Sequence, residues 1–216
     1  MQKAVLAISL CALILPGQAP AKPLLLDSQQ TYMSACLAYK ESHKRMRAIC
    51  EQALDQPGAS MRQRLDIMDS LAWANYYLGQ PDMARQVFQR MLDLDSESED
   101  GLTGMAWIAY DADDYGKAGD LFERAMNRSP SAQVLAGLGV SRFYGRQFDL
   151  DKALRYIDAA LAIDPKYSWA LRRKGWFLQG RHRLSESEKT FRQAVEVDHE
   201  ERLVGEGPTI IQVGRS

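Results

Sequence analysis

The chain has 216 residues, of which 46% are hydrophobic and 25% are charged, as is ordinary for a folded soluble protein. With 27 Lys and Arg residues against 28 Asp and Glu residues, its net charge of -1 gives no general reason to expect nucleic-acid binding. The modest numbers of glycine and proline, 15 and 8, argue against a long disordered tract.

Residues 1–21 predict a secretory signal peptide. Lys3 is followed by twelve uncharged residues, then by Pro16-Gly17 and the small residues Ala19 and Ala21. A basic start, a short apolar run and an A-x-A site are the parts of such a signal, and the run is shorter than the about 20 residues that span a bilayer. We place cleavage after Ala21. A disordered or buried N-terminal segment is the alternative.

Cleavage would leave two cysteines, Cys36 and Cys50, which lie 14 residues apart on either side of an expected helix-turn-helix. In an oxidising periplasm or extracellular space, such a pair closes into a disulfide when a hairpin brings the Cα atoms within about 4.4–6.8 Å. Two buried thiols that act as small hydrophobic residues are the alternative reading.

Helical periodicity then divides the chain into hairpins. Residues 22–58 are expected to form a leader and a degenerate N-terminal hairpin, which Gln56-Pro57-Gly58 ends. Residues 59–198 are expected to form four helix-turn-helix units, with Ser60 and Asp82 as candidate N-caps of the first two helices. The four units cover residues 59–94, 99–130, 132–165 and 167–198.

The second helices of these units share one pattern: a small residue, a large apolar residue four later, a short apolar pair and a stop. Successive copies are offset by 34, 35 and 34 residues, and a fixed period near 34 is typical of stacked helical hairpins. Small residues let the two helices of each unit approach closely, so we expect four contacts. These are Ala72 with Ala84, Ala106 with Ala118, Gly139 with Ala153, and Gly175 with Ser187, while Phe88, Phe122, Ile157 and Phe191 fill the gaps.

On these residues the units resemble tetratricopeptide repeats, well over residues 65–198 and weakly over residues 31–54. The resemblance implies an all-α, right-handed α-solenoid of stacked helix-turn-helix hairpins with a concave inner groove. Asn75 and Arg142 depart from the family pattern, which usually has a large apolar or aromatic residue there. Residues 199–216 include the β-prone stretch 208–213 and are expected to form a flexible tail, with pairing to a partner's sheet edge as the alternative.

Catalytic and metal-binding signatures are poor. His43, His182 and His199 lie far apart and form no metal-binding spacing, and no nucleophile motif is present. We therefore expect no enzyme activity, no metal and no cofactor.

Aromatic residues at the repeat period suggest a binding groove instead. Trp73, Trp107 and Trp176 each follow the small residue of a first helix by one, a place that the resemblance puts on the concave groove. Rings about one turn later should lie on the same side. The predicted binding residues are Trp73, Tyr76, Trp107, Tyr110, Phe143, Trp169, Arg172, Arg173 and Trp176. Rings that merely fill space between first helices are the alternative.

Charge along this groove is uneven. Acidic residues occupy the earlier units (Asp66, Asp69, Asp100, Asp111, Asp113 and Asp114), and basic residues the last (Arg172, Arg173, Lys174, Arg181 and Arg183). A basic end of the groove would take an acidic segment or a C-terminal carboxylate. The alternative is an ordinary solvated surface.

These features predict a periplasmic or secreted, non-catalytic adaptor or scaffold of the cell envelope that binds a partner protein segment in its groove. We expect no nucleic-acid partner and no stable membrane insertion after signal cleavage. The alternative function is a carbohydrate-binding accessory protein of polysaccharide export or biosynthesis, whose rings would stack on sugars.

Overall fold

The structure is a computed structural model that describes residues 34–37 and 42–203, with side chains as far as residue 199. Residues 1–33, 38–41 and 204–216 lie outside the described part. The predicted signal peptide and most of the predicted tail therefore fall outside it.

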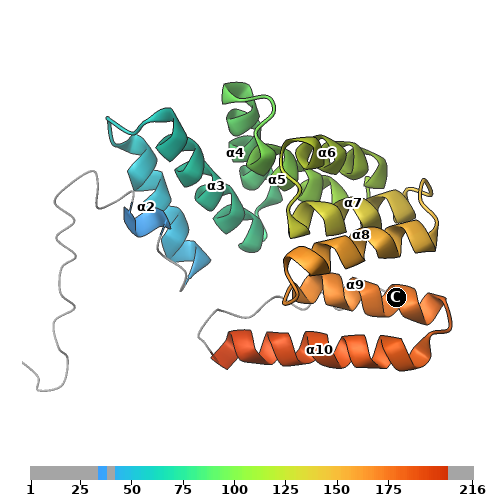
Figure 1. The fold of residues 1–216 in the computed structure, drawn as a ribbon. Coiled ribbons are helices and arrows are strands. Elements are labelled where there is room, and N and C mark those ends of the chain that lie inside the picture. The colour runs from blue at the N-terminus through green and yellow to red at the C-terminus, as the bar shows by residue number, and fades with distance from the viewer. Residues whose placement is uncertain (1–33, 38–41, 204–216) are drawn as a thin grey trace, which may run out of the picture.

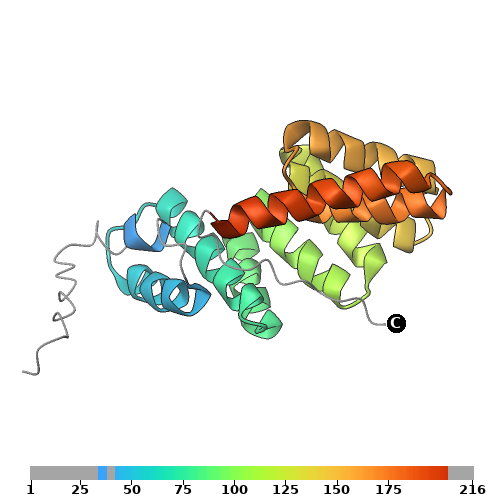
Figure 2. The same ribbon diagram turned by 90° about the horizontal axis from the view of Figure 1, so that it is seen from below.

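All regular structure in the described part is helical. Residues 34–37 are helical, and the longer helices follow as hairpins that stack side by side into a curved solenoid (Figures 1 and 2). This confirms the predicted all-α fold. The helices are α2 (His43–Asp55), α3 (Met61–Tyr77), α4 (Pro81–Leu94), α5 (Glu99–Asp111), α6 (Tyr115–Arg128), α7 (Ala132–Tyr144), α8 (Leu150–Ile163), α9 (Ser168–Gly180) and α10 (Leu184–Leu203).

The helix ends match the predicted turns with one correction. Ser60 caps α3 in a reciprocal capping box with Gln63, as predicted. Asp82 is not the cap of α4, because the helix begins at Pro81 and Gln80 is its N-cap. Proline suits that place since its ring fixes φ and its missing N–H has no helical acceptor there. The Asp82 carboxylate instead pairs with Arg85 at 2.7 Å.

Each hairpin turn places one residue in the left-handed region, at Gly79, Asp113, Arg146 and His182, with φ between 58° and 71°. Only the first of these is glycine, for which this backbone conformation costs least. The last helix, α10, continues to Leu203, past the Asp198 at which we expected the fourth unit to end.

A disulfide joins Cys36 to Cys50 at the N-terminal end of the solenoid. Their Cα atoms lie 4.9 Å apart, inside the range that a disulfide bridges. Both side chains are buried in a cluster with Ala53, Ile67 and Met68, so the bridge fastens residues 34–37 to α2 and to the face of α3.

Exported protein should therefore resist alkylation at Cys36 and Cys50 until it is reduced. Its mass should be about 2 Da below that of the reduced form, because an oxidising compartment removes one hydrogen from each thiol. Peptide mapping after denaturation gives the measurement, and the same sample with reductant, which should take up one alkyl group on each cysteine, is the control. Two thiols that react without reductant would contradict the pairing.

Small residues control packing both within the units and between them. Within units, Ser187 Oγ donates to the carbonyl of Gly175 at 2.8 Å, and a Cβ on Gly139 would lie 3.2 Å from the carbonyl oxygen of Ala153. Between units, Gly104 and Gly137 lie directly under the phenyl rings of the preceding unit. A Cβ on Gly104 would approach the Phe88 ring to 2.2 Å, and a Cβ on Gly137 would approach the Phe122 ring to 2.4 Å.

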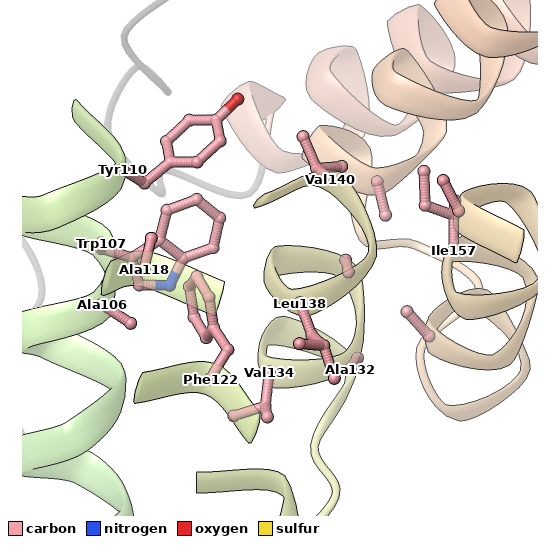
Figure 3. Packing of buried hydrophobic residues seen from close by; sticks show 14 of the residues in the cluster. Ala106, Trp107, Tyr110, Ala118, Phe122, Ala132, Val134, Leu138, Val140 and Ile157 are labelled. Atoms are coloured by element: carbon pink, nitrogen blue, oxygen red, sulfur yellow. The ribbon is translucent and has the colours of Figure 1, made fainter. Parts of the chain in front are cut away.

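Figure 3 shows Phe122 directed from α6 into the space between Trp107 on α5 and helix α7. Its ring meets Trp107 edge-on at 5.2 Å, and Val134 and Leu138 belong to the same buried cluster. Phe88 and Phe122 thus each join their own unit to the next one.

The two departures from the repeat pattern are both buried. Asn75, which lies on α3, is almost fully buried. Arg142 packs its side chain over Gly119, where a Cβ would lie 2.9 Å from the Arg142 Cδ. Its guanidinium then reaches the carboxylates of Asp120 and Glu123 on α6. A long cation can occupy this place because its stem packs while its charge is paired at the surface.

Candidate binding surface on the inner face

The three tryptophans at the repeat period occupy equivalent positions. The Trp73 and Phe88 rings meet edge-on with their centres 5.4 Å apart, and the Trp107 and Phe122 rings meet in the same way with their centres 5.2 Å apart. Trp176 meets Phe191 edge-on at 6.0 Å. Each indole therefore packs against the second-helix ring of its own unit, and the surroundings decide how much of it is exposed.

The first helices bring together five aromatic rings and one guanidinium, and we call this set the inner cluster: Trp73, Tyr76, Trp107, Tyr110, Trp169 and Arg173. Within it Trp107 and Trp169 meet edge-on at 4.8 Å, although they are 62 residues apart and belong to α5 and α9. Tyr110 lies 6.0 Å from the same indole. Helices two units apart come this close only on the concave side of a curved stack. The inner cluster therefore lies on the concave side of the solenoid, which we call the inner face.

The structure corrects the role of Trp107. Its ring is only 6% exposed, because Trp169 covers it from the inner side. It therefore supports the floor of the inner face and offers no free ring to a ligand. Phe143 also packs within the protein, with its ring centre 4.7 Å from that of Phe177 on α9. Its neighbour Tyr144 is 40% exposed.

Trp176 does not join the inner cluster. It is 60% exposed at the last unit, where no described residue covers it. Two rings that sequence reasoning did not select do line the inner face. Tyr167 stacks on Trp169 at 6.0 Å, and Tyr77, which is 45% exposed, stacks on Trp73 at 5.8 Å. Tyr77 directly follows Tyr76, which is the signal that could have found it.

The predicted basic end is mostly neutralised by local ion pairs. Arg172 pairs with Asp198 at 2.8 Å, and Lys174 pairs with Asp158 at 2.8 Å. Arg181 pairs with Asp151, and Arg183 with Glu186. These ion pairs connect α8, α9 and α10, and Arg173 is the remaining member of the predicted basic set.

Arg173 differs from its neighbours. Its guanidinium carbon lies 5.0 Å from the centre of the Trp169 ring and 5.9 Å from that of Tyr110. It forms no ion pair with any described residue. A guanidinium over an aromatic face gains cation–π attraction and keeps its edge N–H groups available.

A hydrogen bond ties the two earlier units together beside this cation. The Tyr76 hydroxyl donates to Asp111 Oδ2 at 2.5 Å, which links α3 to the end of α5. Burial raises the pKa of Asp111, while this hydrogen bond and the charge of Arg173 oppose the rise. Burial and the Asp111 charge both raise the pKa of Tyr76, which therefore stays a neutral donor.

The acidic side of the inner face centres on Asp69. Burial, followed by the charge of Asp100, raises the pKa of Asp69 to about 7, while the nearby Trp73 side chain opposes the rise. Glu99 and Asp66 add smaller repulsions of the same sign. Negative charge is thus concentrated where α3 and α5 meet, and Arg173 lies at the α9 side.

The described residues contain no group of three or more His, Cys, Asp or Glu side chains placed to hold a metal ion. None of the helices in the described part is long and apolar enough to cross a membrane.

No protein-family model matches the chain, and no curated protein matches its sequence. Solved structures do resemble it in fold. MamA from Desulfovibrio magneticus RS-1, residue 41 to the end, is 16% identical with a TM-score of 0.55, over 81% of this chain and 97% of that one. MamA AMB-1 is 20% identical with a TM-score of 0.54, over 80% and 98% of the two chains. At these identities the likeness shows the fold.

Proposed function

We propose that this protein is a non-catalytic adaptor that binds a segment of a partner protein on the inner face. The observation that carries the proposal is Arg173, which lies over Trp169 and Tyr110 without an ion pair to any described residue, while four neighbouring cations are paired. A cation placed in this way is ready for a carboxylate from outside the chain.

The surroundings of Arg173 define the segment. The part-buried Trp169 ring and the exposed Tyr144 ring offer surface to an apolar or aromatic side chain. The acidic residues around Asp69 favour a basic side chain at the α3 side. The expected partner segment therefore carries an acidic side chain or a C-terminal carboxylate at the α9 side, an apolar residue next to it, and a basic residue toward α3.

The proposal places this adaptor in the periplasm or outside the cell. The predicted signal peptide at residues 1–21 supports export. The disulfide between Cys36 and Cys50 supports an oxidising compartment, because cytosolic thiols are kept reduced. The alternative of glycan binding stays a prediction, since no contact among the described residues favours a sugar over a peptide side chain.

Recovery of partners from envelope extract tests the inner face. Immobilised Arg173→Gln should recover its specific partner at about a tenth of the wild-type amount or less, a change that corresponds to about 1.4 kcal/mol. Glutamine removes the charge but keeps part of the stem that packs on the rings. Arg90→Gln, on the exposed surface of α4, is the matched control and should behave as wild type.

Quantitative mass spectrometry of the eluates gives the measurement, and circular dichroism verifies that both variants are folded. Equal recovery by wild type and Arg173→Gln would remove the assignment of Arg173 to the binding surface. A loss with Arg90→Gln as large as that with Arg173→Gln would show a non-specific charge effect instead.

A further inference from the structure

The outer face of α10 carries an apolar surface that no described residue covers. Leu184 and Val195 are each 62% exposed there, and Phe191 lies between them. The surface is a shallow depression of about 600 Å³, whose remaining lining residues are Gln179, Ser187, Glu188, Arg192 and Glu196. Figure 1 shows that α10 has α9 on one side and no helix of the described part on the other. We call this surface the end face.

In the earlier units, the next unit of the solenoid covers the equivalent face. Phe191 occupies the place of Phe88 and Phe122, which are fully buried because Gly104 and Gly137 of the next unit lie against their rings. Val195 occupies the place of Leu92, which the next unit contacts through Gly101. The end face therefore has the same kind of packing surface as the second helices of the earlier units. No described helix packs on it, whereas the first helix of the next unit packs on the others.

We propose that the end face is covered by this chain's own residues 204–216, which turn back along α10 and lay Ile210, Ile211 and Val213 on it. The segment follows α10 directly, because that helix ends at Leu203. It is joined to the face covalently, and a short connection of this kind keeps its apolar residues at about millimolar effective concentration near the face.

The dimensions and the residue order fit. Phe191 lies about 18 Å from Leu203 along the axis, at 1.5 Å per helical residue. Ile210 is seven residues beyond Leu203 and reaches at most about 23 Å in an extended chain. Residues 205–208, Gly-Glu-Gly-Pro, disfavour continuation of the helix and favour a reversal of the chain. Val213 then reaches as far as Leu184.

Pairs of cysteines in the full chain test the contact. Val195→Cys with Ile211→Cys should form a disulfide within one chain about tenfold faster than Gln193→Cys with Ile211→Cys, since effective concentration is high only on the covered side. Gln193 is exposed on α10 but does not line the end face, so it is the matched control at nearly the same sequence distance. Adding Ile210→Asp to the first pair should slow its closure to the control rate.

The linked peptides are identified by mass spectrometry after oxidation at micromolar concentration, which separates the new link from Cys36–Cys50. Links between two chains would show that a second copy occupies the end face and would overturn the proposal. Closure of the Val195 pair no faster than that of the Gln193 pair would overturn it as well.

Discussion

Asp69→Asn should raise the free energy of unfolding above pH 7 by up to about 4 kcal/mol and should flatten the pH dependence of stability between pH 4 and pH 7. The value follows from the rise of the Asp69 pKa from 3.8 to about 7 on folding, at about 1.4 kcal/mol for each pH unit. Burial is the main cause, followed by the charge of Asp100.

The sign is set by proton uptake. Between pH 4 and pH 7 the folded state keeps the Asp69 proton that the unfolded state has lost, so wild-type stability falls as the pH rises through this window. Above pH 7 the carboxylate is charged in both states, and the full cost of burying that charge remains. Asparagine carries no charge, so the variant removes this cost.

Urea unfolding at pH 4.5 and pH 7.5 measures the effect. The two proteins should differ little at the lower pH and most at the higher one. Asp93→Asn is the matched control, because Asp93 is exposed on α4 and its partner Gln89 can donate to an asparagine as well. Parallel stability curves for wild type and Asp69→Asn across the window would contradict the burial of this charge.

The sequence was sufficient for the fold because packing residues recur at a fixed period. Phe88, Phe122 and Ile157 are all fully buried, as their shared place in the repeat predicted. Arg142, which departs from the pattern, still occupies a buried site because its charge reaches Asp120 and Glu123. The period thus predicts which face of each helix is buried even where the residue type is unusual.

The inner face was harder to predict because it depends on curvature. Spacing places Trp107 on the inner side of α5, but it does not show that Trp169, almost two units later, closes over that ring. Likewise, charge order shows that Arg172 and Lys174 are cationic but not that Asp198 and Asp158 come within 2.8 Å of them. Contacts between distant units and paired side chains need the three-dimensional arrangement.

Gly137→Ala should lower the free energy of unfolding by about 3 kcal/mol, the upper end of what an overpacked core usually loses. Its new Cβ would lie 2.4 Å from Phe122 Cζ and 2.7 Å from two further ring carbons. The ring has no direction in which to move, since it is fully buried and Trp107 meets it edge-on. Gly116→Ala is the matched control, because its Cβ would meet only Asp114 Oδ1 at 3.9 Å.

The origin of the loss can be tested with a double-mutant cycle. Phe122→Leu alone should destabilise the protein by leaving unfilled space beneath α7. Combined with Gly137→Ala, however, it should cost less than the sum of the two single losses, because the smaller side chain makes room for the methyl group. Thermal and urea unfolding of the four proteins give the coupling energy. Additive losses would mean that Gly137 acts through the backbone, and that the join between the second and third units does not depend on this glycine–phenyl contact.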